Sequence, residues 1–95
     1  MTLDAFEDLA KKYNCLVMAD YDLDGAYYYL YAPKLADYRL ATFYPKFQAT
    51  EMYMNNGKQQ FTEIDDLEYN LITKLKQLKQ KRIEQKLKDL EKDFV

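Results

Sequence analysis

The sequence predicts an α+β fold: an N-terminal helix, an antiparallel β-meander of three to five strands, and a long C-terminal helix. Three observations support this fold class. Apolar residues first recur at helical spacing, tyrosine-rich runs then flank an Asp-Gly pair, and the chain beyond Ile64 lacks glycine and proline. Ninety-five residues, 48% of them hydrophobic, fit one small domain with a modest core.

The N-terminal helix is expected near residues 3–13. Thr2 or Asp4 is available as its N-cap, and lysines fill its last turn. Asn14 is expected to end the helix in a left-handed conformation. The apolar side chains that share one face of this helix are Leu3, Phe6, Leu9, Ala10 and Tyr13.

A β-hairpin is predicted around Asp24-Gly25, because this dipeptide separates two β-favouring runs and suits a type I′ turn. The turn would place Tyr21 opposite Tyr28 and Asp20 opposite Tyr29. Two faces follow from this register. One holds Val17, Ala19, Tyr21, Leu23, Ala26, Tyr28, Leu30 and Ala32, and is expected to be core. The other holds Leu16, Met18, Asp20, Asp22, Tyr27, Tyr29 and Tyr31.

Residues 38–44 predict a third strand. Pairing Ala32 with Tyr38 would put Leu40 and Tyr44 on the core face. The same register would put Arg39, Ala41 and Phe43 on the face of Tyr27, Tyr29 and Tyr31. Residues 45–61 are ambiguous between a short helix after Pro45 and a hairpin turning at Asn56-Gly57, and we favour the hairpin.

The C-terminal helix has the clearest signals. Asp65 and Glu68 match a capping box, and Ile64 with Tyr69 match a hydrophobic staple. The helix is expected to run from about Asp66 to Asp93, a length of about 42 Å at 1.5 Å per residue.

Apolar residues in this helix form two stripes, about 130° apart around the helix axis at 100° per residue. The first stripe is Leu67, Leu71, Leu75 and Leu78, and the second is Ile83, Leu87, Leu90 and Phe94. We therefore expect residues 1–78 to form the body and residues 79–95 to project from it, with the second stripe mediating homodimerisation. The alternative is a break near residues 79–82 that folds the end back on the body.

The composition excludes most familiar active sites. The chain has no histidine or serine and a single cysteine, Cys15, so Ser-His-Asp and Cys-His sites, His/Cys zinc sites and internal disulfides cannot form. Cys15 is expected to be an inert strand residue, the alternative being a reactive or dimer-bridging thiol. No metal or cofactor is expected, and the sequence predicts a protein that is not an enzyme.

Residues 20–25, Asp-Tyr-Asp-Leu-Asp-Gly, match the opening of a calcium-binding loop. The twelfth position of such a loop would be Tyr31, where a bidentate glutamate is needed, and both flanks predict strands. The turn chemistry of Asp24-Gly25 explains this motif without an ion.

The tyrosine-rich sheet face is the first candidate interaction surface, with Tyr27, Tyr29, Tyr31, Phe43 and Arg39 as the predicted partner-binding residues. One alternative is that residues 45–61 or a helix cover this face. Another is that the tyrosines stack on nucleic-acid bases, but Asp20 and Asp22 border them and would repel phosphates.

The C-terminal helix is basic, whereas the rest of the chain is acidic. Residues 74–95 carry 8 of the 14 basic side chains and only 4 of the 16 acidic ones. The alternative function is therefore a nucleic-acid-binding regulator that uses Lys79, Lys81, Arg82 and Lys86. Interspersed acids favour a solvated helix face instead.

The overall expectation is a small accessory module that binds an unidentified protein partner and forms a homodimer. No run approaches the roughly 20 apolar residues of a membrane span, and the acidic amino terminus is unlike a signal peptide, so a cytoplasmic protein without membrane contact is expected. Richness in lysine, asparagine and tyrosine is compatible with a phage or bacterial accessory or inhibitor protein.

Overall fold

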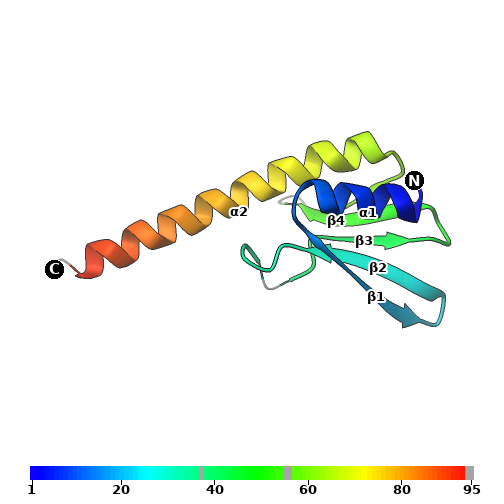
Figure 1. Ribbon diagram of the computed structural model, residues 1–95, viewed down its shortest axis with the longest axis horizontal. Helices are drawn as coiled ribbons and strands as arrows, with labels where there is room; N and C mark the ends of the chain where they lie inside the picture. Colours follow the sequence, from blue (N-terminus) through cyan, green and yellow to red (C-terminus); the bar gives the residue numbers. More distant parts are fainter. Residues whose placement is uncertain (37, 55–56, 94–95) are drawn as a thin grey trace.

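The protein has the predicted α+β fold, a five-stranded antiparallel meander with both helices packed on it (Figure 1). The computed structural model describes residues 1–36, 38–54 and 57–93, with side chains described as far as Glu91. The strands follow one another across the sheet in chain order. The elements are α1 (Leu3–Lys12), β1 (Leu16–Asp22), β2 (Gly25–Tyr31), β3 (Ala41–Tyr44), β4 (Ala49–Met54), β5 (Gly57–Phe61) and α2 (Ile64–Asp93).

Helix α1 begins and ends as its sequence predicts. The Thr2 hydroxyl accepts a hydrogen bond from the Ala5 backbone N–H at 3.2 Å, which satisfies one of the free donors of the first turn. Asn14 has a φ of 57°, and the Cys15 N–H donates to the Ala10 carbonyl at 2.8 Å. This left-handed ending turns the chain directly into β1.

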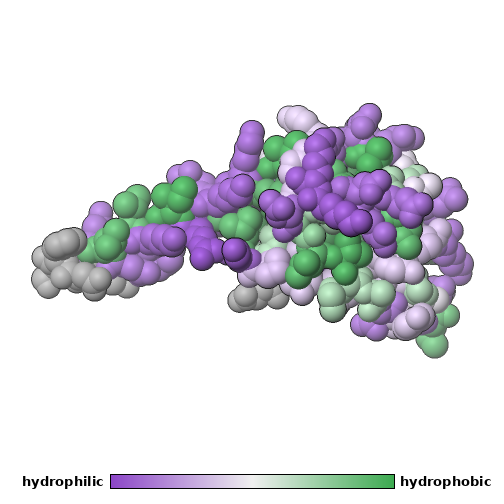
Figure 2. Space-filling view, in the orientation of Figure 1, coloured by the Kyte–Doolittle hydropathy of each residue, from purple (hydrophilic) through white to green (hydrophobic). Residues whose placement is uncertain are grey.

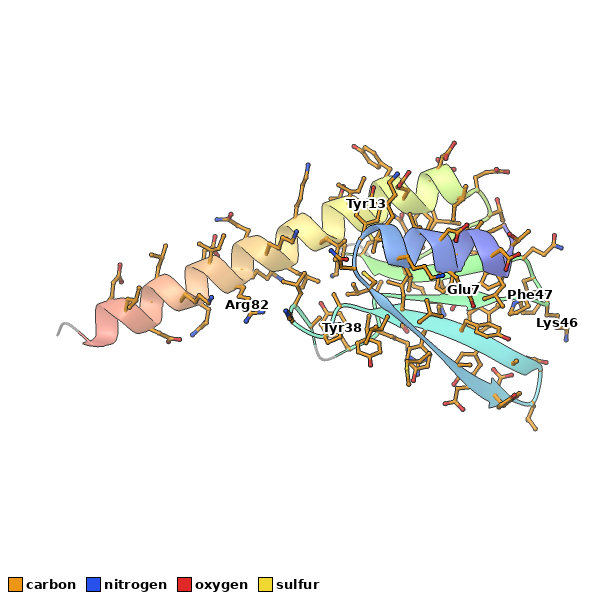
Figure 3. The ribbon with its side chains drawn as sticks, in the orientation of Figure 1. Glu7, Tyr13, Tyr38, Lys46, Phe47 and Arg82 are labelled. Atoms are coloured by element: carbon orange, nitrogen blue, oxygen red, sulfur yellow. The ribbon has the colours of Figure 1, made fainter. Side chains whose placement is uncertain are left out.

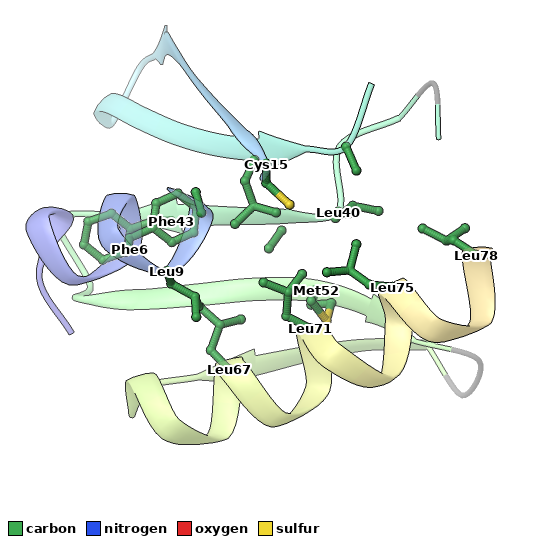
Figure 4. Close-up of a cluster of buried hydrophobic side chains, with 14 residues drawn as sticks. Phe6, Leu9, Cys15, Leu40, Phe43, Met52, Leu67, Leu71, Leu75 and Leu78 are labelled. Atoms are coloured by element: carbon green, nitrogen blue, oxygen red, sulfur yellow. The ribbon is translucent and has the colours of Figure 1, made fainter. Parts of the chain in front are cut away.

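The core lies between the helices and one face of the sheet (Figure 4). Phe6 of α1 stacks on Phe43 of β3 with ring centroids 5.5 Å apart. The first stripe of α2 packs against the same face, where Met52 is fully buried. The four buried side chains of that stripe are Leu67, Leu71, Leu75 and Leu78, as predicted.

The β1–β2 hairpin turns one residue earlier than predicted. Asp22 pairs with Gly25, so Leu23 and Asp24 are the central turn residues. The predicted type I′ turn needs positive φ at Asp24 as well as Gly25, but of the two only Gly25 has it, at 112°. The Asp22 carboxylate accepts a hydrogen bond from the Asp24 N–H at 2.8 Å, which stabilises the observed turn.

The correction moves every pairing by two residues, so that Tyr21 faces Ala26 instead of Tyr28. Because side chains alternate with a period of two, the members of each face are unchanged. The predicted core face is only partly covered, however. Leu30 and Ala32 are buried, whereas Tyr21 and Leu23 at the hairpin tip are exposed.

Strand β3 is shorter than the predicted residues 38–44, and its register is advanced by one residue. The Leu40 N–H donates to the Leu30 carbonyl at 2.8 Å, as the predicted register requires, yet Leu30 pairs with Ala41. Two residues therefore oppose one, the arrangement of a β-bulge. Beyond this bulge the two faces exchange. Phe43 pairs with Tyr28 and is 2% exposed in the core, so its prediction as a partner-binding residue on the tyrosine-rich face is wrong.

Residues 49–61 form the favoured hairpin, β4 and β5, rather than a helix. Met54 pairs with Gly57, and residues 55 and 56, which include half of the predicted Asn56-Gly57 turn, lie outside the described residues. Because the hairpin extends the sheet sideways, it does not cover the tyrosine-rich face. The core side chains of both helices contact the opposite face, so the prediction of a covering element is also wrong for the described residues.

Helix α2 begins at Ile64, two residues before its predicted start. The Leu67 N–H donates to the Glu63 carbonyl at 3.2 Å. Glu68 does not act in a capping box, because its carboxylate accepts hydrogen bonds from the Lys12 ammonium at 2.7 Å and the Tyr13 hydroxyl at 2.9 Å. Tyr69 is 73% exposed and makes no hydrophobic staple. Glu68 therefore joins α2 to α1 through a tertiary contact, instead of forming the predicted capping box at the start of α2.

Helix α2 is continuous to Asp93, so the alternative of a break near residues 79–82 is wrong. Its last buried side chain is Leu78, and all described side chains from residue 79 onward are exposed. The C-terminal half extends well beyond the sheet (Figure 1). This extension gives the molecule dimensions of 54 × 25 × 25 Å.

Candidate interaction surfaces

The first candidate surface is the uncovered side of the sheet. We call it the tyrosine face and define it by Tyr27, Tyr29, Tyr31, Tyr44 and Arg39. The rings of Tyr27 and Tyr29 lie 6.4 Å apart, those of Tyr29 and Tyr31 lie 6.5 Å apart, and those of Tyr27 and Tyr44 lie 5.9 Å apart. These tilted contacts leave each tyrosine half-buried by its neighbours. The face is therefore an ordered aromatic surface.

Arg39 lies on this face, as predicted. Its guanidinium is 4.3 Å from the ring centroid of Tyr29 and 5.6 Å from that of Tyr27. A cation over an aromatic ring at an exposed site stabilises by about 0.5–1 kcal/mol. The stacking fixes the direction of the guanidinium but leaves its edge donors available to a partner.

Tyr44 is a member of this face that the sequence did not indicate, because the bulge at Leu40 reverses its predicted side. Burial raises the pKa of the Tyr44 phenol, and the nearby Glu51 carboxylate adds to the increase. Tyr44 also contacts Phe47 edge-on, with 6.5 Å between ring centroids. The aromatic surface therefore continues from β2 across β3 into the β3–β4 turn.

Two shallow hollows lie on either side of Arg39. One, of about 330 Å³, is lined by Thr42, Tyr44, Glu51 and Tyr53, with Arg39 at its edge. The other, of about 450 Å³, is lined by Met18, Tyr29, Tyr31, Tyr38 and Arg39. Both are open to solvent, and both combine aromatic walls with a cation. Both hollows are therefore depressions of the surface and not enclosed cavities.

Acidic residues border the tyrosine face at the β1–β2 turn. Asp20 and Asp22 are exposed on the same side of the sheet as Tyr27 and Tyr29. Asp24 lies 3.5 Å from the Lys46 ammonium, and Asp22 bonds the turn backbone. Among the described residues, no three potential metal ligands are grouped closely enough to hold an ion. The end of the calcium-loop motif, Asp22 to Gly25, forms the β1–β2 turn.

The second candidate surface is the second stripe on the projecting half of α2. Ile83, Leu87 and Leu90 are 53%, 56% and 54% exposed, and Phe94 lies outside the described residues. Figure 2 shows hydrophobic side chains along the projection, flanked by hydrophilic ones. No element in the described part of the chain packs on them.

The basic residues of the alternative function do not form one patch. At about 100° per residue, Lys79, Arg82 and Lys86 lie on one side of α2, whereas Lys81 lies roughly 160° away from Lys79. Arg82 lies on the side of α2 that faces the loop after β2 (Figure 3), where it lines a hollow with Leu35 and Ala36. Acidic Glu84 also lies within this segment. A phosphate backbone running along any one side of the helix would meet only some of these cations.

Cys15 is buried beside the end of α1, and its thiol lies 3.7 Å from the Tyr13 carbonyl. Burial raises the pKa of the Cys15 thiol, which lowers its thiolate fraction at neutral pH. Cys15 precedes β1, so its prediction as a strand residue is wrong, and its predicted lack of reactivity stays a prediction.

No helix within the described residues has the length and hydrophobicity needed to cross a bilayer.

The comparisons with known proteins do not identify a family for this chain. No family model, curated protein or solved structure matches the chain.

Proposed function

We propose that this protein is a non-enzymatic binding module that associates with a second copy through the projecting half of α2. The observation that carries the proposal is the stripe of Ile83, Leu87 and Leu90, which is exposed on a continuous helix. Exposed apolar side chains that recur on one helix face are typical of an interface. The folded body holds the first half of α2 helical, so the projecting half extends a helix that is already nucleated.

The tyrosine face supports a second contact, with a protein partner of different sequence. Its tyrosines combine a large apolar surface with hydroxyl groups, and Arg39 is held ready to donate hydrogen bonds. A dimer would present two such faces, so a partner with two matching sites would gain affinity from simultaneous binding. The acidic border at Asp20 and Asp22 favours a protein partner over a nucleic acid.

The dimer is tested by replacing one residue of the stripe with a charge. Leu87→Asp should abolish self-association, because each dimer would bury two carboxylates against an apolar seam. The matched control is Gln85→Asp, which makes the same change of charge on the opposite side of the exposed helix. Size exclusion with light scattering over a range of concentrations measures the mass of each variant.

A monomeric wild-type protein at all concentrations would contradict the proposal, as would a dimer that survives Leu87→Asp.

The dependence of binding on salt concentration distinguishes the nucleic-acid alternative from association through the helix. Binding of labelled duplex DNA through several phosphate contacts should weaken by orders of magnitude between about 50 and 200 mM salt, whereas association through an apolar seam should change far less.

A further inference from the structure

The spacing of the exposed stripe assigns heptad positions to the projecting helix. Ile83, Leu87 and Leu90 are separated by four and three residues, the spacing of successive d, a and d positions in a coiled coil. The preceding a position is Gln80, and the d position before it is Lys76. The apolar seam therefore starts at Ile83, just beyond the last contact of α2 with the body at Leu78.

Charges of opposite sign flank this seam on its two sides. Between residues 79 and 91, the e positions are occupied by Glu84 and Glu91 and the g positions by Lys79 and Lys86, and the next g position is Asp93. All four side chains are exposed, and none makes an ion pair with another described side chain. One edge of the seam is thus acidic and the other basic.

This arrangement distinguishes the two orientations of a helix pair. In a parallel pair each g position faces the e position five residues later on the other helix. Lys79 then meets Glu84 of the second copy, and Lys86 meets Glu91, and twofold symmetry repeats both pairs. An antiparallel pair with Ile83 opposite Leu87 places Leu90 opposite Gln80. It brings Glu84 against Glu84 and Lys86 against Lys86, although the position of Lys79 then faces that of Asp93.

The body approaches α2 along the start of the projection, where Lys79 lines a hollow with Tyr13 and Leu35. The stripe lies about 130° around the helix from the leucines that hold α2 to the sheet. The loop after β2 approaches α2 on the body side, where Leu35 and Ala36 line a hollow together with Leu78 and Arg82. Two bodies would therefore lie on the outer sides of the paired helices.

We propose that the second copy binds in parallel and in register, with Ile83, Leu87 and Leu90 each facing the same residue of the other chain. This inference rests on the proposed self-association and adds its orientation. A seam of about two heptads buries less surface than a standard protein interface, so the dimer should be concentration-dependent. The four inter-helical ion pairs select the orientation, since each exposed pair contributes only modestly.

The orientation is tested by disulfide cross-linking in a Cys15→Ala background. One chain carries Gln80→Cys, and a second chain with a larger tag carries Leu90→Cys. A parallel pair joins each variant only to its own kind, because each introduced thiol faces the same position of the other helix. The antiparallel pair described above joins the Gln80→Cys chain only to the Leu90→Cys chain, since two thiols introduced at position 80 would lie about 15 Å apart along the axis.

Non-reducing gels separate these products by size, and Lys88→Cys on the outer side of the helix gives the background level of cross-linking. Mixed dimers of the two variants with few like-with-like products would overturn the parallel orientation while leaving self-association intact. No cross-link above background, together with a monomeric mass in light scattering, would overturn both proposals. If Cys15→Ala disturbs the fold, the same cysteine variants can be made in a chain that retains Cys15, which is buried.

Charge reversal gives an independent measurement. Lys79→Glu with Lys86→Glu, or Glu84→Lys with Glu91→Lys, should each weaken self-association about tenfold or more, because four attractive pairs become repulsive. An equimolar mixture of the two double variants should restore association. An antiparallel dimer already opposes like charges at its centre, so unchanged association in the separate variants would overturn the inference.

Discussion

The two halves of helix α2 have similar sequences and opposite environments. Both contain leucine or isoleucine at spacings of three and four, with lysine and glutamine between them. In the first half the leucines are buried against the sheet, whereas in the second half the equivalent side chains are half-exposed. Helix formation therefore depends on local sequence shared by both halves, while the stability of each half depends on what covers it. The same amphipathic pattern serves folding in one half and association in the other.

The largest expected difference between the halves is the cost of removing a leucine. Leu71→Ala should lower the free energy of unfolding by about 2–5 kcal/mol, because it leaves a cavity beneath a fully buried side chain. Leu87→Ala should change the unfolding free energy of the monomer by less than about 0.5 kcal/mol, since no described residue packs on it. Urea unfolding at a concentration below dimerisation measures both. Equal losses would show that the second stripe packs on the body.

A smaller difference is expected when glycine replaces glutamine in each half. Gln77→Gly should lower global stability by about 1 kcal/mol, because α2 is helical at this position only in the folded body. Gln85→Gly should loosen the projecting end and leave the global unfolding midpoint of the monomer unchanged. Circular dichroism follows helicity, and hydrogen exchange identifies which amides lose protection. A shift of the global midpoint by Gln85→Gly would contradict independent fraying of the projection.

The smallest expected effect concerns the contact that fastens the first half of α2 to α1. The Lys12 ammonium and the Tyr13 hydroxyl, which both donate to Glu68, hold the pKa of that carboxyl below its usual value. The pKa of Lys12 is raised by the same contact. Glu68 therefore stabilises the fold above its unfolded pKa of about 4.3, and this contribution disappears as pH falls through the lower folded value.

The Lys12 contribution is present below its unfolded pKa and is lost as pH rises through its higher folded pKa. The stability difference between the wild type and Glu68→Gln should therefore be largest between about pH 5 and 9 and decline on both sides. Thermal unfolding from about pH 3 to about pH 11 measures the difference. At a concentration below dimerisation, Glu84→Gln on the projecting half is the matched control. A difference that grows as the solution is acidified would contradict this assignment.

Several features of the fold and of both surfaces were predictable because their signals are local. The alternation of residues 27–31 separated Tyr28 from Tyr27, Tyr29 and Tyr31, and a turn displaced by one residue could not change that separation. The two stripes of α2 followed from helical periodicity alone. Asn14 marked the end of α1 because few other residues adopt positive φ easily.

The side occupied by Phe43 was not predictable in this way. A single extra residue at Leu40 exchanges the faces of β3, and no residue type near it requires a bulge. Glu68 was similarly misassigned, because its position suits a local cap while its partners, Lys12 and Tyr13, are more than fifty residues away in the chain.

The sequence by itself determined both helices, the first hairpin and the side chains that share a face within each of these elements, because periodicity and turn chemistry act over a few residues. Tertiary structure alone decided that no described element covers the tyrosine face, where the bulge lies, and that α2 continues beyond Leu78 without a break. These features depend on contacts between distant segments, whose geometry is set by packing the whole core. The exposed stripe and the tyrosine face are the surfaces that this packing left uncovered.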